Sequence, residues 1–153
     1  MRSGDGRREI PQRVGILNLQ FANCDLQMTE QDLIDRTKQF ALRVIKLVDA
    51  LPRTIAGRAI ASQLMRSGTS VAANYRAACR ARSKAEFIAK LGTVEEEADE
   101  SAFWLDLIID AGLLSAAKTS PLLKETTEII AIMASSKKTA AKSQIANRKS
   151  AIP

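Results

Sequence analysis

The chain of 153 residues has 46% hydrophobic and 26% charged residues, contains no histidine, and carries a formal net charge of +6. This length suits one domain with a sizeable core. The lack of histidine excludes Ser-His and Cys-His nucleophiles and imidazole metal ligands, and the sequence contains no glycine-rich phosphate loop. It also contains no membrane-spanning apolar run and no signal-peptide apolar region. We therefore expect a cytoplasmic protein that is not an enzyme and has no cofactor, metal or membrane partner.

Residues 1–28 differ from the rest of the chain. They contain scattered glycines and arginines and one short alternating piece, LNLQF at 17–21. Met28 comes directly before a well-formed helix start. Two interpretations stay open for this segment: a disordered tail, or an extension upstream of a translation start at Met28.

The first two helices are predicted over about 30–50 and 54–80. Thr29 is the expected N-cap of the first, and Pro52 stops it. Weak helix formers at 67–70, Ser-Gly-Thr-Ser, interrupt the second, and we expect them to let a neighbouring helix approach closely. At 100° per residue, four arginines of the second helix fall within an arc of about 80° opposite its apolar face: Arg58, Arg66, Arg76 and Arg80.

The third helix is predicted to begin at the capping-box pattern SKAE of 83–86 and to end at Gly112. Its predicted core face consists of Phe87, Leu91, Val94, Ala98, Leu105 and Ile109. Apolar residues also cover other sides of its second half, and we predict that they form an oligomer interface, with internal core as the alternative: Phe103, Trp104, Leu107 and Ile108.

The fourth helix is predicted to start at Ser120-Pro121, with serine as N-cap and proline at the first helical position. Residues 137–153 hold five cations and no acid, among them Lys137, Lys138 and Lys142. We expect this segment to be a disordered basic tail. Because the connections between helices are short, residues 29–136 predict an all-α, antiparallel, up-down-up-down four-helix bundle in a single domain.

The arginine face of the second helix has two interpretations. From Glu95 to Asp110 the third helix carries seven acids and no cation, so the arginines could pair with these acids. Alternatively they bind nucleic-acid phosphates, with the tail lysines adding contacts, in a salt-sensitive and sequence-independent manner. The candidate nucleic-acid-binding residues are Arg58, Arg66, Arg76, Arg80, Lys137, Lys138 and Lys142. Without histidine, and with consecutive glutamates that cannot all face one core, the acids do not predict a metal site.

The segment SQLMRSGTSVAANYRAACRARSKAEF at 62–87, followed by an acidic helix with Trp104, resembles the four-helix-bundle proteins of the 23S rRNA intervening-sequence type. That family includes the accessory variability determinant of diversity-generating retroelements. The resemblance covers about residues 29–136 and implies a short antiparallel bundle that assembles into a ring-like homopentamer. For the retroelement branch it also implies binding of nucleic acid and of a reverse transcriptase through basic surface, and it supplies no catalytic residues. Ala77 and Ala78 stand where members commonly have an acid, and the branch stays open.

Together these features predict a non-enzymatic, homo-oligomeric accessory protein associated with RNA or DNA. The alternative is a protein-protein interaction scaffold whose charges serve assembly of the homo-oligomer.

Overall fold

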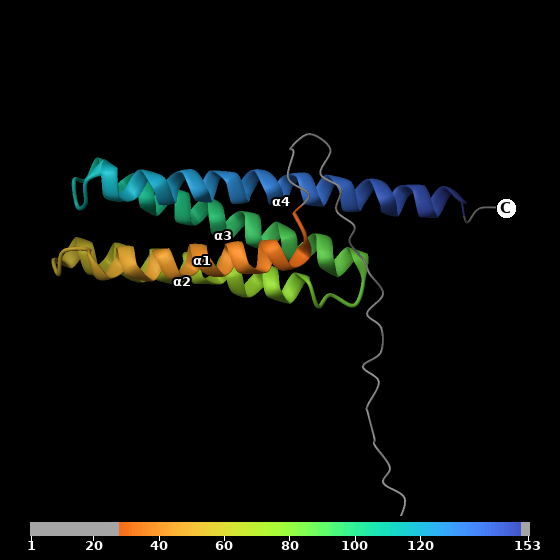
Figure 1. The fold of residues 1–153 in the computed structure, drawn as a ribbon, viewed down its shortest axis with the longest axis horizontal. Helices are drawn as coiled ribbons and strands as arrows, with labels where there is room; N and C mark the ends of the chain where they lie inside the picture. Colours follow the sequence, from red (N-terminus) through yellow and green to blue (C-terminus); the bar gives the residue numbers. More distant parts are fainter. Residues whose placement is uncertain (1–27, 151–153) are drawn as a thin grey trace, which may run out of the picture.

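The computed structural model describes residues 28–150, with the side chains of 144 and 146–150 outside the description. The described chain forms four helices and no strand: α1 (Glu30–Asp49), α2 (Ile55–Ala78), α3 (Lys84–Asp110) and α4 (Ala116–Ser150). Figure 1 shows that successive helices run in opposite directions and lie side by side. This confirms the predicted all-α up-down bundle. The interpretations of residues 1–27 lie outside the described part.

The helix starts follow from capping side chains. At α1, the backbone N–H of Asp32 donates to Thr29 Oγ1 (3.1 Å), and the N–H of Thr29 donates to Asp32 Oδ2 (2.7 Å). This reciprocal pair satisfies two backbone donors that the helix itself leaves free. At α3, Ser83 Oγ accepts from the Glu86 N–H (3.1 Å), but the Glu86 carboxylate accepts from Arg82 instead of Ser83. The predicted capping box of α3 is therefore only half formed.

The predicted start of the fourth helix at Ser120-Pro121 is wrong. The helix begins at Ala116, where the N–H groups of Lys118 and Thr119 donate to the Ser115 carbonyl (3.0 and 3.3 Å). Pro121 lies inside α4, where its ring leaves one carbonyl of the preceding turn without a helical donor. Proline is exposed at this position, so water can satisfy that carbonyl. The pattern of serine followed by proline therefore does not mark the start of this helix.

The predicted disorder of residues 137–153 is wrong for 137–150, because α4 continues to Ser150, and residues 151–153 lie outside the described part. This segment is rich in alanine and lysine and contains no glycine, a composition that favours helix. Ala140 is buried and belongs to the core, and Lys84 Nζ donates to Ser143 Oγ. The bundle therefore extends beyond residue 136. None of the helices in 28–150 combines the length and apolar character that crossing a membrane would require.

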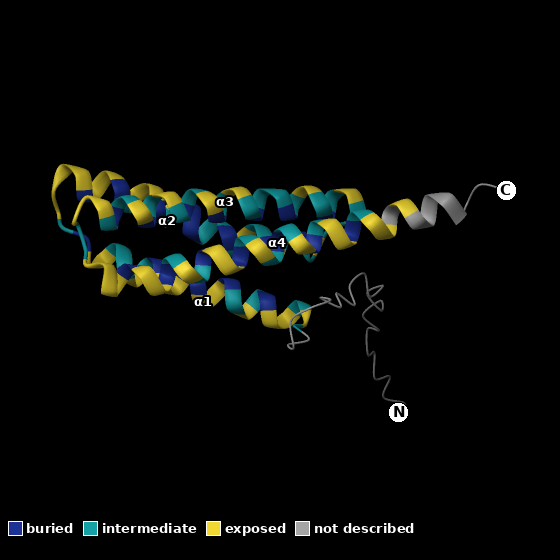
Figure 2. Cartoon of the chain, turned by 90° about the horizontal axis from the view of Figure 1, so that it is seen from above, coloured by how far each residue is buried: buried dark blue, intermediate teal, exposed yellow. Residues whose placement is uncertain are grey.

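Small residues in the middle of α2 allow neighbouring helices to come close, as predicted. A Cβ atom on Gly68 would lie 2.7 and 2.8 Å from the two Cγ atoms of Val44 on α1. On the side facing α3, the buried Ser101 hydroxyl donates to the buried Ser67 hydroxyl (3.0 Å). Figure 2 shows the buried residues along the facing sides of the helices. The weak helix formers in α2 are thus explained by packing.

Candidate nucleic-acid interface

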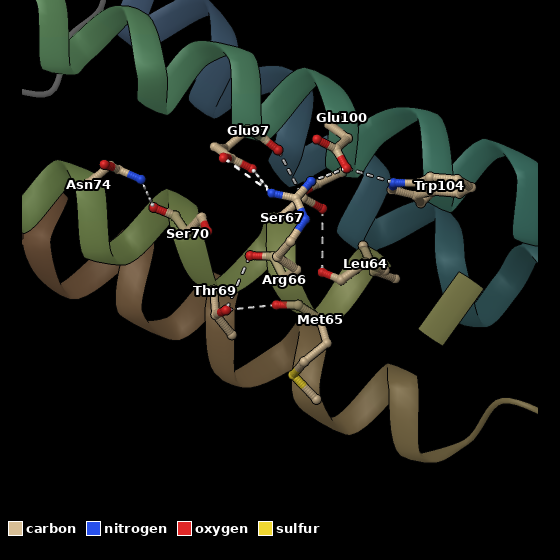
Figure 3. A network of polar contacts seen from close by, with 11 residues as sticks. Leu64, Met65, Arg66, Ser67, Thr69, Ser70, Asn74, Glu97, Glu100 and Trp104 are labelled. Carbon is tan, nitrogen blue, oxygen red and sulfur yellow. Dashed lines mark hydrogen bonds and ion pairs between the residues drawn. The ribbon is translucent and has the colours of Figure 1, made fainter. Parts of the chain in front are cut away.

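Arg66, in the middle of α2, is neutralised within its own chain. Its Nη1 lies 3.3 Å from Glu97 Oε2, and its Nη2 pairs with Glu100 Oε1. Trp104 Nε1 donates to the same Glu100 oxygen (3.1 Å), as Figure 3 shows. The hydrogen bonds from Arg66 and Trp104 lower the pKa of Glu100, and the bond to Glu100 raises the pKa of Arg66. For this one arginine, the structure confirms the interpretation as an ion pair with α3.

Arg58 lies one turn into α2, near the opposite end of the helix from Arg76 and Arg80. Its side chain is exposed, and Nη1 donates to the Arg53 carbonyl (2.6 Å). Within residues 28–150 it forms no ion pair. Its charge is therefore not balanced by α3.

Arg76 and Arg80, in and just after the last turn of α2, are exposed. They line a cleft of about 560 Å³ between α1 and α2, with Lys38 on the same cleft and the carboxylates of Glu30 and Asp35 on its α1 wall. Neither arginine forms an ion pair with another described residue. Their guanidinium groups are available to an external anion, and a planar guanidinium matches a phosphate with two parallel hydrogen bonds.

Cys79 lines the same cleft, and Tyr75 lies one helical turn before it. Cys79 is half-buried on the cleft wall, and burial, followed by the negative charge of Glu30, raises its pKa to about 11. Tyr75 is almost fully buried, and burial also raises its pKa. A thiol nucleophile needs a lowered pKa, so the cleft holds no activated cysteine.

The three candidate lysines of α4 divide into one paired and two exposed residues. Lys137 Nζ lies 2.8 Å from Glu95 Oε2, whereas Lys138 and Lys142 are exposed. The contact of Lys84 with Ser143 holds this part of α4 against the start of α3. The end of α2 and the second half of α4 lie at the same end of the bundle (Figure 1), but the two helices do not contact each other.

The predicted oligomer interface on α3 is partly contradicted. Phe103 is 56% exposed and stacks edge-on against Trp104 with ring centroids 4.9 Å apart, whereas Trp104 and Leu107 are half-buried against the core. Ile108 is wrongly assigned to the interface, because it is fully buried in its own chain. It lies three residues after buried Leu105 and so shares that residue's face of the helix.

The predicted core residue Ile109 is only half-buried, one position away from the face that the helix turns inward. Sequence reasoning also missed an ion-pair cluster between α1 and α4. Arg36 Nε lies 2.6 Å from Glu125 Oε1, and Arg36 Nη2 pairs with Glu128. The spacing of the two glutamates, three residues apart on one helix face, was the available signal. Among residues 28–150, no three acidic or cysteine side chains gather as a metal site would require.

Comparisons with known proteins agree with the resemblance found in the sequence. Residues 29–135 match the family model described as 23S rRNA-intervening sequence protein. A crystal structure of a protein of unknown function from the S23 ribosomal protein family of Bacteroides thetaiotaomicron VPI-5482 is 33% identical, with a TM-score of 0.66. That match covers 69% of this chain and 98% of the other. No curated protein matches the chain.

Proposed function

Because the chain belongs to the 23S rRNA-intervening sequence protein family, we propose that it is a non-enzymatic, cytoplasmic accessory protein that associates with nucleic acid. In this proposal a homo-oligomer of four-helix bundles, the homopentamer that the resemblance implies, binds phosphates of RNA or DNA. The binding surface is the basic end of the bundle, defined as Arg76, Arg80, Lys138 and Lys142.

The observation that carries the proposal is the contrast among the cations. Arg66 and Lys137 are paired with α3 acids, so we assign them to the fold. Arg76 and Arg80 are exposed and have no ion pair among the described residues. Each phosphate that these cations neutralise releases condensed counterions, which makes binding favourable at low salt and independent of sequence.

Oligomerisation would repeat the basic end in each copy. Several weak phosphate contacts on one particle then act together, because after the first contact the others become intramolecular. The only tryptophan, Trp104, is half-buried and bonded to Glu100, and Tyr75 is buried. Single-strand-binding proteins usually stack bases on exposed aromatic rings. The proposal therefore includes no base stacking on these two rings.

The test is fluorescence anisotropy of a labelled 20-nucleotide RNA, and of a DNA duplex of that length, with the full chain. If four cations contact phosphates, raising monovalent salt from about 50 to 200 mM should weaken RNA binding roughly 50-fold. At low salt we expect Arg76→Glu with Arg80→Glu to weaken binding about tenfold or more.

The matched control is Arg53→Glu with Arg58→Glu, which makes the same charge change at the other end of α2. We expect this control to retain most of the binding. Equal losses in the two double variants would show that only overall charge matters and would overturn the assignment to the basic end.

A second candidate is the protein-protein interaction scaffold, which the Arg66 pairing favours because it shows cations serving helix packing. This candidate predicts that the wild-type protein retains neither RNA nor DNA at about 50 mM salt. It gains support if a protein such as a reverse transcriptase, the partner that the retroelement branch implies, binds the oligomer without nucleic acid.

A further inference from the structure

A second cleft lies between the C-terminal part of α1 and the N-terminal part of α4. Its volume is about 350 Å³. Three leucines and three exposed cations line it, without any acid: Leu47, Leu114, Leu122, Arg43, Lys46 and Lys118. None of the three cations forms an ion pair with a described residue. The cleft therefore combines an apolar floor with uncompensated positive charge.

The outward face of α3 has the opposite character. Phe103, 56% exposed, is the large apolar side chain at its centre. Acids at i−4, i+3 and i+7 lie on the same helix face, and these three residues, Asp99, Asp106 and Asp110, are all exposed. We call this surface, Phe103 with the three aspartates, the acidic aromatic face.

The two surfaces cannot meet within one chain. The helix α3 packs against α2 and α4 and makes no close approach to α1. Phe103 points away from the core, because at 100° per residue it lies about 160° around the helix from buried Leu105 and about 140° from buried Ala98. Within residues 28–150, no segment covers the acidic aromatic face.

We propose that the acidic aromatic face of one copy docks into the basic cleft of a second copy. Phe103 would enter the cleft among the three leucines, while Asp99 and Asp106 would lie opposite Arg43, Lys46 and Lys118. This inference rests on the homo-oligomer in the proposed function and names its contact. The contact joins two different surfaces, so it is heterologous and leads to a ring or to an open chain of subunits.

Charge complementarity identifies a second copy as the occupant. Nucleic acid would be repelled by the acids around Phe103, and it would leave the exposed ring uncovered. A copy of this chain supplies an aromatic anchor and matching charge together, which are the features of an interface centre. Trp104 packs against the Phe103 ring and limits its motion, which reduces the entropy lost on docking.

The test is light scattering of the full-length protein, of 16.7 kDa per chain, at fixed protein concentration and salt. Asp106→Lys alone and Lys118→Glu alone should each lower the particle mass toward that of the monomer. The two substitutions combined should restore it, because each contact then regains opposite charges. Lys124→Glu, an exposed α4 position outside the cleft, is the matched control and should leave the mass unchanged.

Cross-linking gives a second measurement that does not rely on the mass of the oligomer. In a Cys24→Ser, Cys79→Ser background, Phe103→Cys and Lys118→Cys proteins should form a disulfide when mixed, but neither should cross-link with itself. Circular dichroism shows whether each variant is folded.

The possible results distinguish a failure of this contact from a failure of the proposed homo-oligomer. A wild-type oligomer whose mass ignores both charge reversals would overturn this contact and leave the proposed homo-oligomer standing. A wild-type monomer would overturn both the contact and the homo-oligomer. Nucleic-acid binding is tested separately by the anisotropy measurement. Self-cross-linking of the Phe103→Cys protein would replace the heterologous contact by a symmetric one and so overturn the inference.

Discussion

The middle and the end of α2 carry the same residue type in different surroundings. In the middle, Arg66 is held by two α3 glutamates, next to small residues that let neighbouring helices approach. About three to four turns later, Arg76 and Arg80 are exposed beside a cleft and have no ion-pair partner among the described residues. One arginine is therefore paired within the fold, whereas the other two are exposed and unpaired among the described residues. The register between α2 and α3 decides which cations are neutralised.

The largest expected effect concerns the cysteine at the end of α2. With a pKa of about 11 against an ordinary value of 9.0, Cys79 has on the order of 100-fold less thiolate near neutral pH than an unperturbed thiol. In a Cys24→Ser protein, its reaction with a disulfide reagent should be slowed by a similar factor. Glu30→Gln should speed the reaction, because the charge of Glu30 contributes to the raised pKa. A reaction as fast as that of a free cysteine would mean that Arg76 and Arg80 fold over the thiol instead of facing solvent.

Two glycines in helix interiors provide a matched test of packing in the middle of α2. Gly68→Ala places a Cβ 2.7 Å from a Val44 methyl group, and we expect a net loss of about 1–2 kcal/mol after the gain in helix propensity. Gly92→Ala in α3 meets only Lys137 Nζ, 3.9 Å away, and should gain about 0.5–1 kcal/mol. Urea unfolding followed by circular dichroism measures both. Equal effects at the two positions would show that Gly68 does not set the distance between α1 and α2.

The capping residues and the core periodicity were predictable from sequence because they depend on neighbours within one or two helical turns. Thr29 and Ser83 both cap their helices, and Leu91, Val94 and Ala98 are all buried. These local signals were sufficient to define the bundle.

The wrong predictions came from sequence patterns that are compatible with more than one structure. The Ser-Pro pair at 120–121 resembles a helix start, yet the preceding alanines and lysine form helix readily and the proline is tolerated in an exposed turn. The basic composition of 137–150 suggested disorder, but contacts with α3 hold its first part in place. Which arginine meets an acid depends on the relative axial position of two helices, and periodicity within one helix does not contain that information.

The two arginines that pair with glutamates of a neighbouring helix, Arg36 and Arg66, differ in how far their side chains are exposed. Arg36, with 25% of its side chain exposed, contacts two α4 glutamates, and Arg36→Gln should cost about 1 kcal/mol of stability. Arg66 is 51% exposed, so Arg66→Gln should cost less, because solvent screens its pairs. Urea unfolding gives both values, with Lys124→Gln as an exposed control. A larger loss for Arg66 than for Arg36 would contradict the dependence on burial.

The smallest expected effect is the acid sensitivity of the Arg66 cluster. The folded protein holds the pKa of Glu100 below its ordinary value of 4.5 through hydrogen bonds from Arg66 and Trp104. A lowered pKa contributes stability above the unfolded-state value, and that contribution disappears as pH falls through the folded-state pKa.

Unfolding free energy should therefore decrease as the pH is lowered from about 5 to 3. Arg66→Gln should flatten this part of the profile, and Trp104→Phe should flatten it less, because the Arg66 bond is the larger cause. Asp32 also has a lowered pKa, caused by its bonds with Thr29, so the informative quantity is the difference between each variant and wild type. An Arg76→Gln variant should follow the wild-type profile, because that arginine is not among the causes of the lowered pKa of Glu100 or of Asp32. If Arg76→Gln changed the profile as much as Arg66→Gln, the end of α2 would be part of the same structural charge network, and its arginines would not be free for phosphate.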